Sequence, residues 1–86
     1  MSELREHRLK RLSMRSMRRG IKEMDLILAR YAELRLEEFD DATLDRYDAL
    51  LSENDQDLYQ WVSGQKPAPD GLRDMILDIS SVAFER

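Results

Sequence analysis

Apolar residues recur at spacings of three and four along most of the chain, the period of a helix that is buried on one side. The pattern is strongest between Ile21 and Tyr31, and no segment alternates apolar and polar residues over the length of a strand. Short breaks separate the periodic segments, so neighbouring helices should pack roughly antiparallel. The sequence therefore predicts an all-α fold, a compact five-helix bundle that forms a single domain over residues 1–86.

The predicted helices differ in how much apolar surface they offer. A basic first helix covers about 3–17 and has a narrow stripe at Leu9, Leu12 and Ser16. The next segment, about 19–38, has the broadest apolar face, and three C-terminal helices fill about 42–84. Beyond the first stripe we expect the core to hold Ile21, Met24, Ile27, Leu28, Tyr31, Leu34, Leu44, Tyr47, Leu50, Leu51, Leu58, Trp61, Val62, Leu72, Met75, Ile76, Ile79, Val82 and Ala83.

Short polar residues and glycine mark the ends of these helices. Asp40 or Asp41 suits the N-cap of the third helix, because a short carboxylate can accept a free backbone N–H. Asn54 or Asp55 would cap the fourth helix, and Asp70 the fifth. Gly64 suits the position after the fourth helix, where a left-handed conformation often ends a helix. Met14 and Met17 are not assigned to core or surface.

The residue types exclude several kinds of catalytic chemistry. The 86 residues include no cysteine, which excludes disulfides, thiolate nucleophiles and sulfur-bound zinc. The three glycines are scattered and form no phosphate loop. The single histidine, His7, lies among arginines, and a solvated surface residue is a better interpretation than a general base. We expect no enzyme, no catalytic residue, no metal site and no cofactor held by this chain.

Charge is distributed unevenly along the sequence. Residues 1–22 hold eight basic and two acidic residues, a net charge of +6, whereas the remainder carries −10. Such a basic arm can bind an anionic partner or pack against its own acidic body. All six aromatic residues lie in the acidic body, whereas a single-stranded nucleic acid needs stacking aromatics beside the positive charge. Nucleic acid is therefore not the expected partner.

The sequence also suggests a compartment. No apolar run approaches the roughly 20 residues that cross a bilayer, and the N-terminus lacks the apolar stretch of a signal peptide. The absence of cysteine favours a reducing compartment. Glu3 and Glu6 are atypical of a mitochondrial presequence. We expect a monomer without membrane contact in a bacterial cytoplasm, and the mitochondrial matrix is the less favoured alternative.

One segment, Arg18-Arg19-Gly20-Ile21-Lys22-Glu23-Met24-Asp25, resists a purely structural interpretation. Arg19 and Glu23 lie four apart and would share a face on a continuous helix. Gly20 leaves that face without a side chain, so another backbone can approach closely. By itself, an Arg–Glu spacing of four is also typical of a surface ion pair, which contributes roughly 0–1 kcal/mol.

This segment resembles the signature of the succinate dehydrogenase assembly factor family that promotes flavinylation. The signature is Arg-Gly-x-x-Glu at the start of the second helix, here Arg19-Gly20-Ile21-Lys22-Glu23, preceded by Arg15-Ser16-Met17-Arg18 and followed by Asp25. Later, Asp55-Gln56-Asp57-Leu58-Tyr59-Gln60-Trp61 is similar to the family's Asp-x-Asp-Leu-x-x-Trp segment. The resemblance covers about residues 8–66. Met14 and Gln56 depart from it, where many members have an aromatic residue and a proline.

The resemblance implies a helical assembly factor that binds the flavoprotein subunit of succinate dehydrogenase and, in some bacteria, that of fumarate reductase. FAD would become joined to a histidine of the partner, so this chain would need no cofactor of its own. The motif residues Arg19, Gly20 and Glu23 would form a partner-binding face, with Arg18 and Asp25 as secondary contacts. Arg19 would contact a partner carboxylate or carbonyl. Glu23 would accept from a partner donor or orient Arg19 in the free protein.

The alternative function is a regulatory binding module, antitoxin-like or RNA-associated, that uses the basic arm. The two functions differ in their response to salt and ligand. A nucleic-acid binder should retain RNA with a steep salt dependence, whereas an assembly factor should bind one protein surface and ignore RNA.

Overall fold

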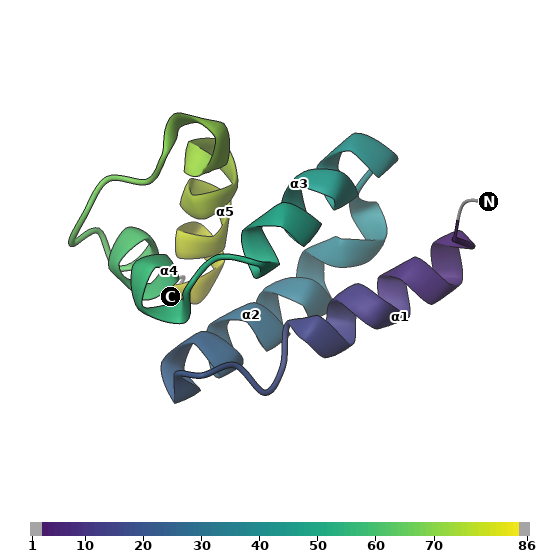
Figure 1. Ribbon diagram of the computed structural model, residues 1–86, viewed down its shortest axis with the longest axis horizontal. Coiled ribbons are helices and arrows are strands. Elements are labelled where there is room, and N and C mark those ends of the chain that lie inside the picture. The colour runs from purple at the N-terminus through teal and green to yellow at the C-terminus, as the bar shows by residue number, and fades with distance from the viewer. Residues whose placement is uncertain (1–2, 85–86) are drawn as a thin grey trace.

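A computed structural model describes residues 3–84, and in this range the chain folds into helices without any strand (Figure 1). The α-helices are α1 (Arg5–Arg15), α2 (Lys22–Arg35), α3 (Asp41–Leu51), α4 (Asp55–Val62) and α5 (Arg73–Ala83), and the short 3-10 turns are η1 (Leu36–Glu38) and η2 (Asp70–Leu72). The predicted all-α five-helix bundle is confirmed. No helix within residues 3–84 is long and apolar enough to cross a membrane.

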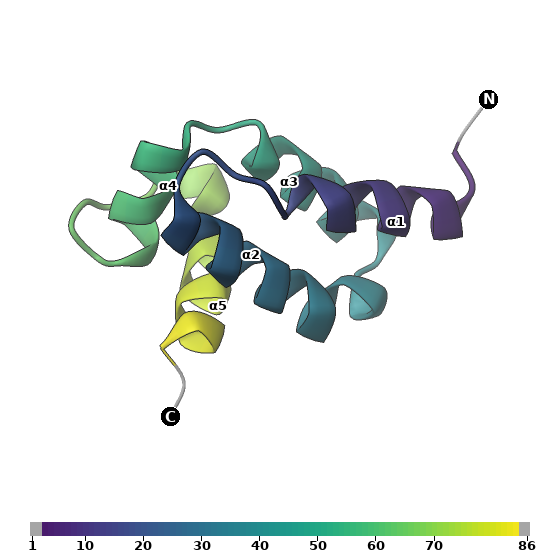
Figure 2. The ribbon, with the colours of Figure 1, turned by 90° about the horizontal axis from the view of Figure 1, so that it is seen from below.

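Helix α2 lies at the centre of the bundle. It contacts α1, α4 and α5, and α1 runs beside it in the opposite direction (Figure 1). Figure 2 shows α4 and α5 gathered at one end of the molecule, while α1 extends toward the other. The bundle measures 39 × 25 × 25 Å. The loop between α1 and α2 therefore lies near the end where α4 begins.

The core follows the predicted stripes closely. Leu34 is the exception, because its side chain is 44% exposed. Each residue turns an α-helix by about 100°, which carries Leu34 beyond the stripe formed by Met24, Leu28 and Tyr31. The core is instead extended by Leu36 of η1. The buried apolar residues are Leu12, Met24, Leu28, Tyr31, Ala32, Leu36, Leu44, Tyr47, Leu50, Leu51, Leu58, Val62, Ile76, Ile79 and Val82.

Three predicted helix ends are confirmed. The Asp40 side chain accepts the backbone N–H of Thr43 at 2.8 Å and caps α3. The Asn54 side chain accepts the N–H of Gln56 at 2.8 Å and caps α4. Gly64 follows α4 with a left-handed φ of 83°. Because Asn54 fills the cap, the neighbouring Asp55 carboxylate is free to bond elsewhere.

The prediction that Asp70 caps the fifth helix is wrong. The carbonyl of Pro69 accepts the N–H of Leu72 at 2.9 Å, so a 3-10 turn forms first and α5 begins only at Arg73. The Asp70 carboxylate accepts from the Arg73 guanidinium at 2.9 Å instead. The first two helices are also shorter than predicted, because the chain leaves the helical conformation between Arg15 and Lys22.

The basic face of α1 packs against the acidic face of α3. Arg8 pairs with Asp45, and Asp48 pairs with both Arg11 and Arg15. Arg5 donates to the carbonyls of Glu37 at 3.1 Å and Phe39 at 2.6 Å. Of the two possibilities for the basic arm, the structure therefore shows packing against the chain's own acidic body. We call these contacts of Arg5, Arg8, Arg11 and Arg15 the arginine ladder.

Candidate partner-docking site

The Arg-Gly motif lies in a non-helical loop, the α1–α2 junction (residues 16–21). Helix α1 ends at Arg15, and Arg18 in the junction adopts a left-handed conformation with φ of 57°. This conformation is unfavourable for a residue other than glycine, and a hydrogen bond stabilises it here. The backbone N–H of Arg18 donates to the Asp25 carboxylate at 2.8 Å. Asp25 therefore closes the junction onto the first turn of α2.

A carboxylate from another helix holds the two motif residues. One oxygen of Asp55 accepts from Nε of Arg19 at 2.8 Å, and the other accepts the backbone N–H of Gly20 at 2.6 Å. The Arg19 guanidinium also donates to the carbonyl of Arg15 at 3.1 Å. The side chains of Arg19 and Asp55 are only 11% and 18% exposed. We call this arrangement of Arg19, Gly20 and Asp55 the Asp55 bridge.

Glycine suits position 20 because of this contact. A Cβ built on Gly20 would lie 3.0 Å from the Asp55 oxygen that accepts the amide. At that separation the carboxylate would have to move, which would lengthen one or both of its hydrogen bonds. The close backbone approach expected of Gly20 is therefore made to Asp55 of the same chain.

The structure separates the predicted site residues into two groups. Arg19 and Gly20 meet at the Asp55 bridge, and Asp25 binds the backbone of Arg18. The Arg18 guanidinium and the Glu23 carboxylate are exposed and form no ion pair with any residue of the 3–84 range. Since α1 and α2 are not continuous here, the alternative in which Glu23 orients Arg19 is wrong, and Asp55 does so.

Sequence reasoning missed Asp55 as a partner of the motif. It assigned Asp55 to helix capping, a role that Asn54 fills. A signal was nevertheless present, because Asp55 begins the second segment that carries the family resemblance. The two resembling segments meet in space at the Asp55 bridge.

A buried contact between two hydroxyl groups joins the α1–α2 junction to the core. Ser16 is completely buried, and its hydroxyl donates to the carbonyl of Leu12 at 2.8 Å and lies 2.5 Å from the Tyr47 hydroxyl. Burial raises the pKa of Tyr47 to about 12. The Tyr47 ring also packs against Tyr31, with the ring centroids 5.7 Å apart, and against Phe39 at 6.1 Å. The end of α1 is thus joined to the core through α3.

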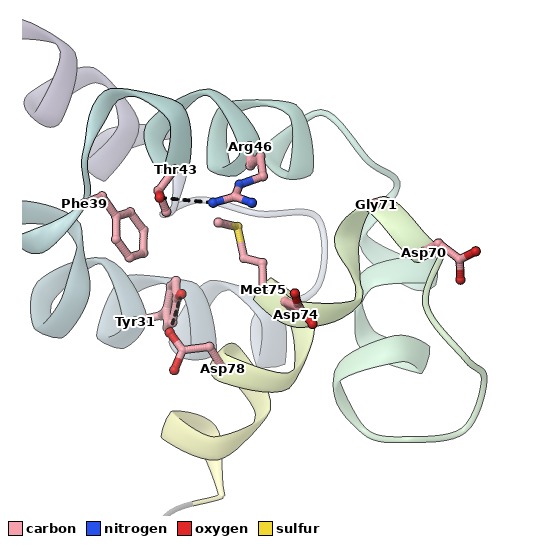
Figure 3. Close-up of a pocket in the computed structure, with 9 residues that line it drawn as sticks. All are labelled: Tyr31, Phe39, Thr43, Arg46, Asp70, Gly71, Asp74, Met75 and Asp78. Atoms are coloured by element: carbon pink, nitrogen blue, oxygen red, sulfur yellow. Dashed lines mark hydrogen bonds between the residues drawn. The ribbon is translucent and has the colours of Figure 1, made fainter.

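A cavity of about 230 Å³ lies between α3 and the η2–α5 segment (Figure 3). The Tyr31 hydroxyl donates to Asp78 at 2.7 Å, and Arg46 donates to Thr43 at 3.2 Å. Burial raises the pKa of Tyr31, which keeps its proton. Within residues 3–84, no three acidic or histidine side chains gather in a way that could hold a metal ion. The Tyr31 and Thr43 hydroxyls of the lining are therefore already hydrogen-bonded within the chain.

Comparison with known proteins identifies relatives over most of the chain. Residues 10–83 match the model of a family described as flavinator of succinate dehydrogenase. A protein of Meyerozyma guilliermondii named mitochondrial succinate dehydrogenase assembly factor 2 is 43% identical over 84% of this chain and 56% of its own length. Its namesakes in Scheffersomyces stipitis and Drosophila grimshawi are 44% and 36% identical, each over 84% of this chain and 50% of their own length.

These relatives correct one prediction and confirm another. The expected bacterial cytoplasm is contradicted, since the relatives from fungi and a fly are named as mitochondrial proteins. The chain spans about half the length of the curated relatives it matches. The resemblance that the Arg-Gly-x-x-Glu motif indicated is confirmed over nearly the whole sequence: the chain belongs to the family of succinate dehydrogenase flavinators.

Proposed function

We propose that this chain binds the flavoprotein subunit of succinate dehydrogenase and promotes covalent attachment of FAD to that subunit. Family membership supports the link to succinate dehydrogenase. The observation that carries the proposal is the Asp55 bridge, which fixes the motif loop in one shape at the surface. A loop that is ordered before binding loses less conformational entropy on docking. The chain acts as a binding partner and leaves the chemistry to the flavoprotein.

The motif residues would divide this task between shaping the loop and contacting the partner. Arg19 is almost fully enclosed and already paired with Asp55, so we assign it to positioning the loop. Gly20 is exposed, and the Asp55 carboxylate fills the space of its missing Cβ, so we assign Gly20 to shaping the exposed loop that meets the partner. The exposed side chains of Arg18 and Glu23 would form the polar contacts with the partner. The Asp25 carboxylate would hold Arg18 in place by accepting the backbone N–H of Arg18.

The arginine ladder favours this function over the RNA-associated alternative. Arg8, Arg11 and Arg15 are engaged by carboxylates of α3. A phosphate backbone would have to displace these carboxylates, and the acidic α3 would then repel it.

The mitochondrial names of the relatives support a mitochondrial site of action for this chain as well.

The test is the covalent flavin on the flavoprotein subunit, measured by in-gel fluorescence in cells that express, lack or carry variants of this chain. Deletion and Gly20→Arg should abolish the fluorescence while the subunit remains present. Gly71→Arg is the matched control, because Gly71 is also exposed and a Cβ there would meet no atom within 4 Å. Circular dichroism should show that both variants remain helical. Unchanged fluorescence in the deletion strain would refute the proposed function.

A further inference from the structure

The outer face of α1 carries a shallow, mostly apolar groove beside the α1–α2 junction. Its lining consists of His7, Lys10, Arg11, Met14 and Arg15, which lie three and four residues apart on one helix face. The apolar surface must come from the methionine and from the carbon stems of the basic side chains, which can cover apolar surface while their charges stay in water. We call this feature the Met14 groove.

Two methionine side chains are exposed near the end of α1. Met14 is 60% exposed and Met17, in the junction, is 44% exposed. By contrast, Met24 is fully buried in the core. Flexible, polarisable methionine side chains are over-represented at surfaces that adapt to a bound helix. Met14 lines the groove and Met17 lies in the adjoining motif loop, so each of the two carries an exposed methionine.

The charges around the groove indicate the chemistry of its occupant. The arginines that face α3 are neutralised, whereas the side chains of Lys10, in the groove, and Arg18, in the adjoining junction, form no ion pair with any residue of the 3–84 range. Glu6 lies four residues before Lys10 but forms no ion pair with it. The groove therefore offers an apolar strip with unneutralised positive charge on its edges. A second copy of this chain that presented the same groove would bring the same positive charge and would be repelled.

We propose that the Met14 groove docks an acidic amphipathic helix of the flavoprotein subunit, an inference that rests on the proposed function. A helix suits the groove because the lining side chains form ridges at spacings of three and four along α1, and such ridges pack into the grooves of a second helix. Acidic residues along the edges of that helix would pair with Lys10 and Arg18, and its apolar strip would cover Met14 and Met17. The groove would add a second contact beside the motif loop.

The first test places a photo-crosslinking amino acid at Met14 or at Leu77 and uses the purified flavoprotein subunit. Leu77 is the matched control because it is 62% exposed but lies on α5. Irradiation should crosslink the subunit through position 14 and not through position 77, and mass spectrometry should place the crosslink in an acidic helical segment. Equal crosslinking at both positions, or a crosslink to a segment without acidic residues, would overturn the proposal.

A second test measures affinity for the same subunit at several salt concentrations. Lys10→Glu should raise Kd by about tenfold or more and flatten the salt dependence, since reversing a charge beside an acidic partner turns attraction into repulsion. Lys66→Glu, an exposed lysine after α4, should leave Kd unchanged. If Lys10→Glu binds as the parent does, or if the groove binds anionic lipid vesicles and not the subunit, the groove proposal is wrong.

Failure of the groove and failure of the proposed function give different results. If Gly20→Arg abolishes binding and flavin attachment while Lys10→Glu changes neither, only the groove proposal fails. If the parent chain does not bind the subunit at all and its deletion leaves flavin attachment intact, both proposals fail together.

Discussion

Asp55 accepts the backbone N–H of Gly20 at 2.6 Å although the two residues lie 35 positions apart in the chain. The second oxygen of the same carboxylate accepts from Arg19. One side chain at the start of α4 therefore fixes both residues that begin the motif. Because Arg19 and Asp55 are mostly enclosed, solvent and salt should screen their attraction less than that of a surface pair.

Replacement of Asp55 by asparagine tests how strongly this bridge stabilises the fold. The amide would leave the Arg19 guanidinium without a counter-ion. Its NH2 group would also face one of the two donors, Arg19 or the Gly20 N–H, from which the Asp55 carboxylate now accepts. We expect the free energy of unfolding to fall by about 1–3 kcal/mol. Urea denaturation followed by circular dichroism measures the loss, and hydrogen exchange at the Gly20 amide should accelerate.

Asp57→Asn is the control for this substitution. Asp57 also lies in the first turn of α4, where a negative charge interacts favourably with the helix dipole, but its side chain is exposed. Asp57→Asn should lower the free energy of unfolding by only a few tenths of a kcal/mol. Equal losses for the two variants would show that the helix dipole, rather than the bridge, accounts for the effect of Asp55.

Local patterns were sufficient to predict the helices but not the bridge. The stripe from Met24 to Tyr31 and the caps at Asp40 and Asn54 depend on residues a few positions apart, and these predictions are confirmed. Asn54 and Asp55 were equivalent as caps from sequence alone. What distinguishes them is a partner from another helix, and such long-range pairing leaves no periodic trace in the sequence.

The arginine ladder illustrates the same limit on predicting the site. The sequence showed that a basic arm precedes an acidic body, and it left open whether the two would meet. The answer depends on which faces of α1 and α3 are opposed, and this is set by packing around α2. The sequence predicts Arg18 and Glu23 as partner contacts, but it did not show that the break between α1 and α2 would leave Glu23 unpaired with Arg19.

Asp48→Asn tests the contribution of the ladder, since Asp48 pairs with both Arg11 and Arg15. Its loss leaves two arginines without this partner, although Glu3 still accepts from Arg11 at 3.0 Å. We expect a loss of about 1 kcal/mol in 50 mM salt that shrinks as salt is raised, because these partly exposed charges are screened. Hydrogen exchange should show faster opening of α1 than of α5.

The control for the ladder is Asp70→Asn. Asp70 pairs with Arg73 three residues away, and both side chains are largely exposed. Its replacement should leave stability within about 0.5 kcal/mol of the parent at every salt concentration. A salt-independent loss in Asp48→Asn would instead indicate a packing or hydrogen-bonding role for that side chain.

Gly20→Ala examines the close approach without adding a large side chain. The new Cβ would lie 3.0 Å from the Asp55 oxygen, so the carboxylate must shift and weaken its bond to the amide. We expect a loss of about 1 kcal/mol, comparable to one hydrogen bond. Gly71→Ala should be neutral or slightly stabilising, because no atom lies within 4 Å of its Cβ. Thermal unfolding compares the two, and an equal Tm would argue against the tight contact at Gly20.

The buried Tyr47 should make the protein sensitive to alkaline pH. Its pKa is raised from the ordinary value of 10 to about 12, so the folded state holds a proton that the unfolded state loses more readily. This contribution is complete below pH 10 and is lost as pH rises from 10 toward 12. Tyr47→Phe should therefore show a shallower loss of unfolding free energy above pH 10. Ser16→Ala removes the hydrogen bond between the Ser16 and Tyr47 hydroxyls but keeps the phenol. This variant should therefore retain the steep alkaline loss of unfolding free energy. If both variants lose stability alike above pH 10, burial of the Tyr47 phenol is not the source of the alkaline sensitivity.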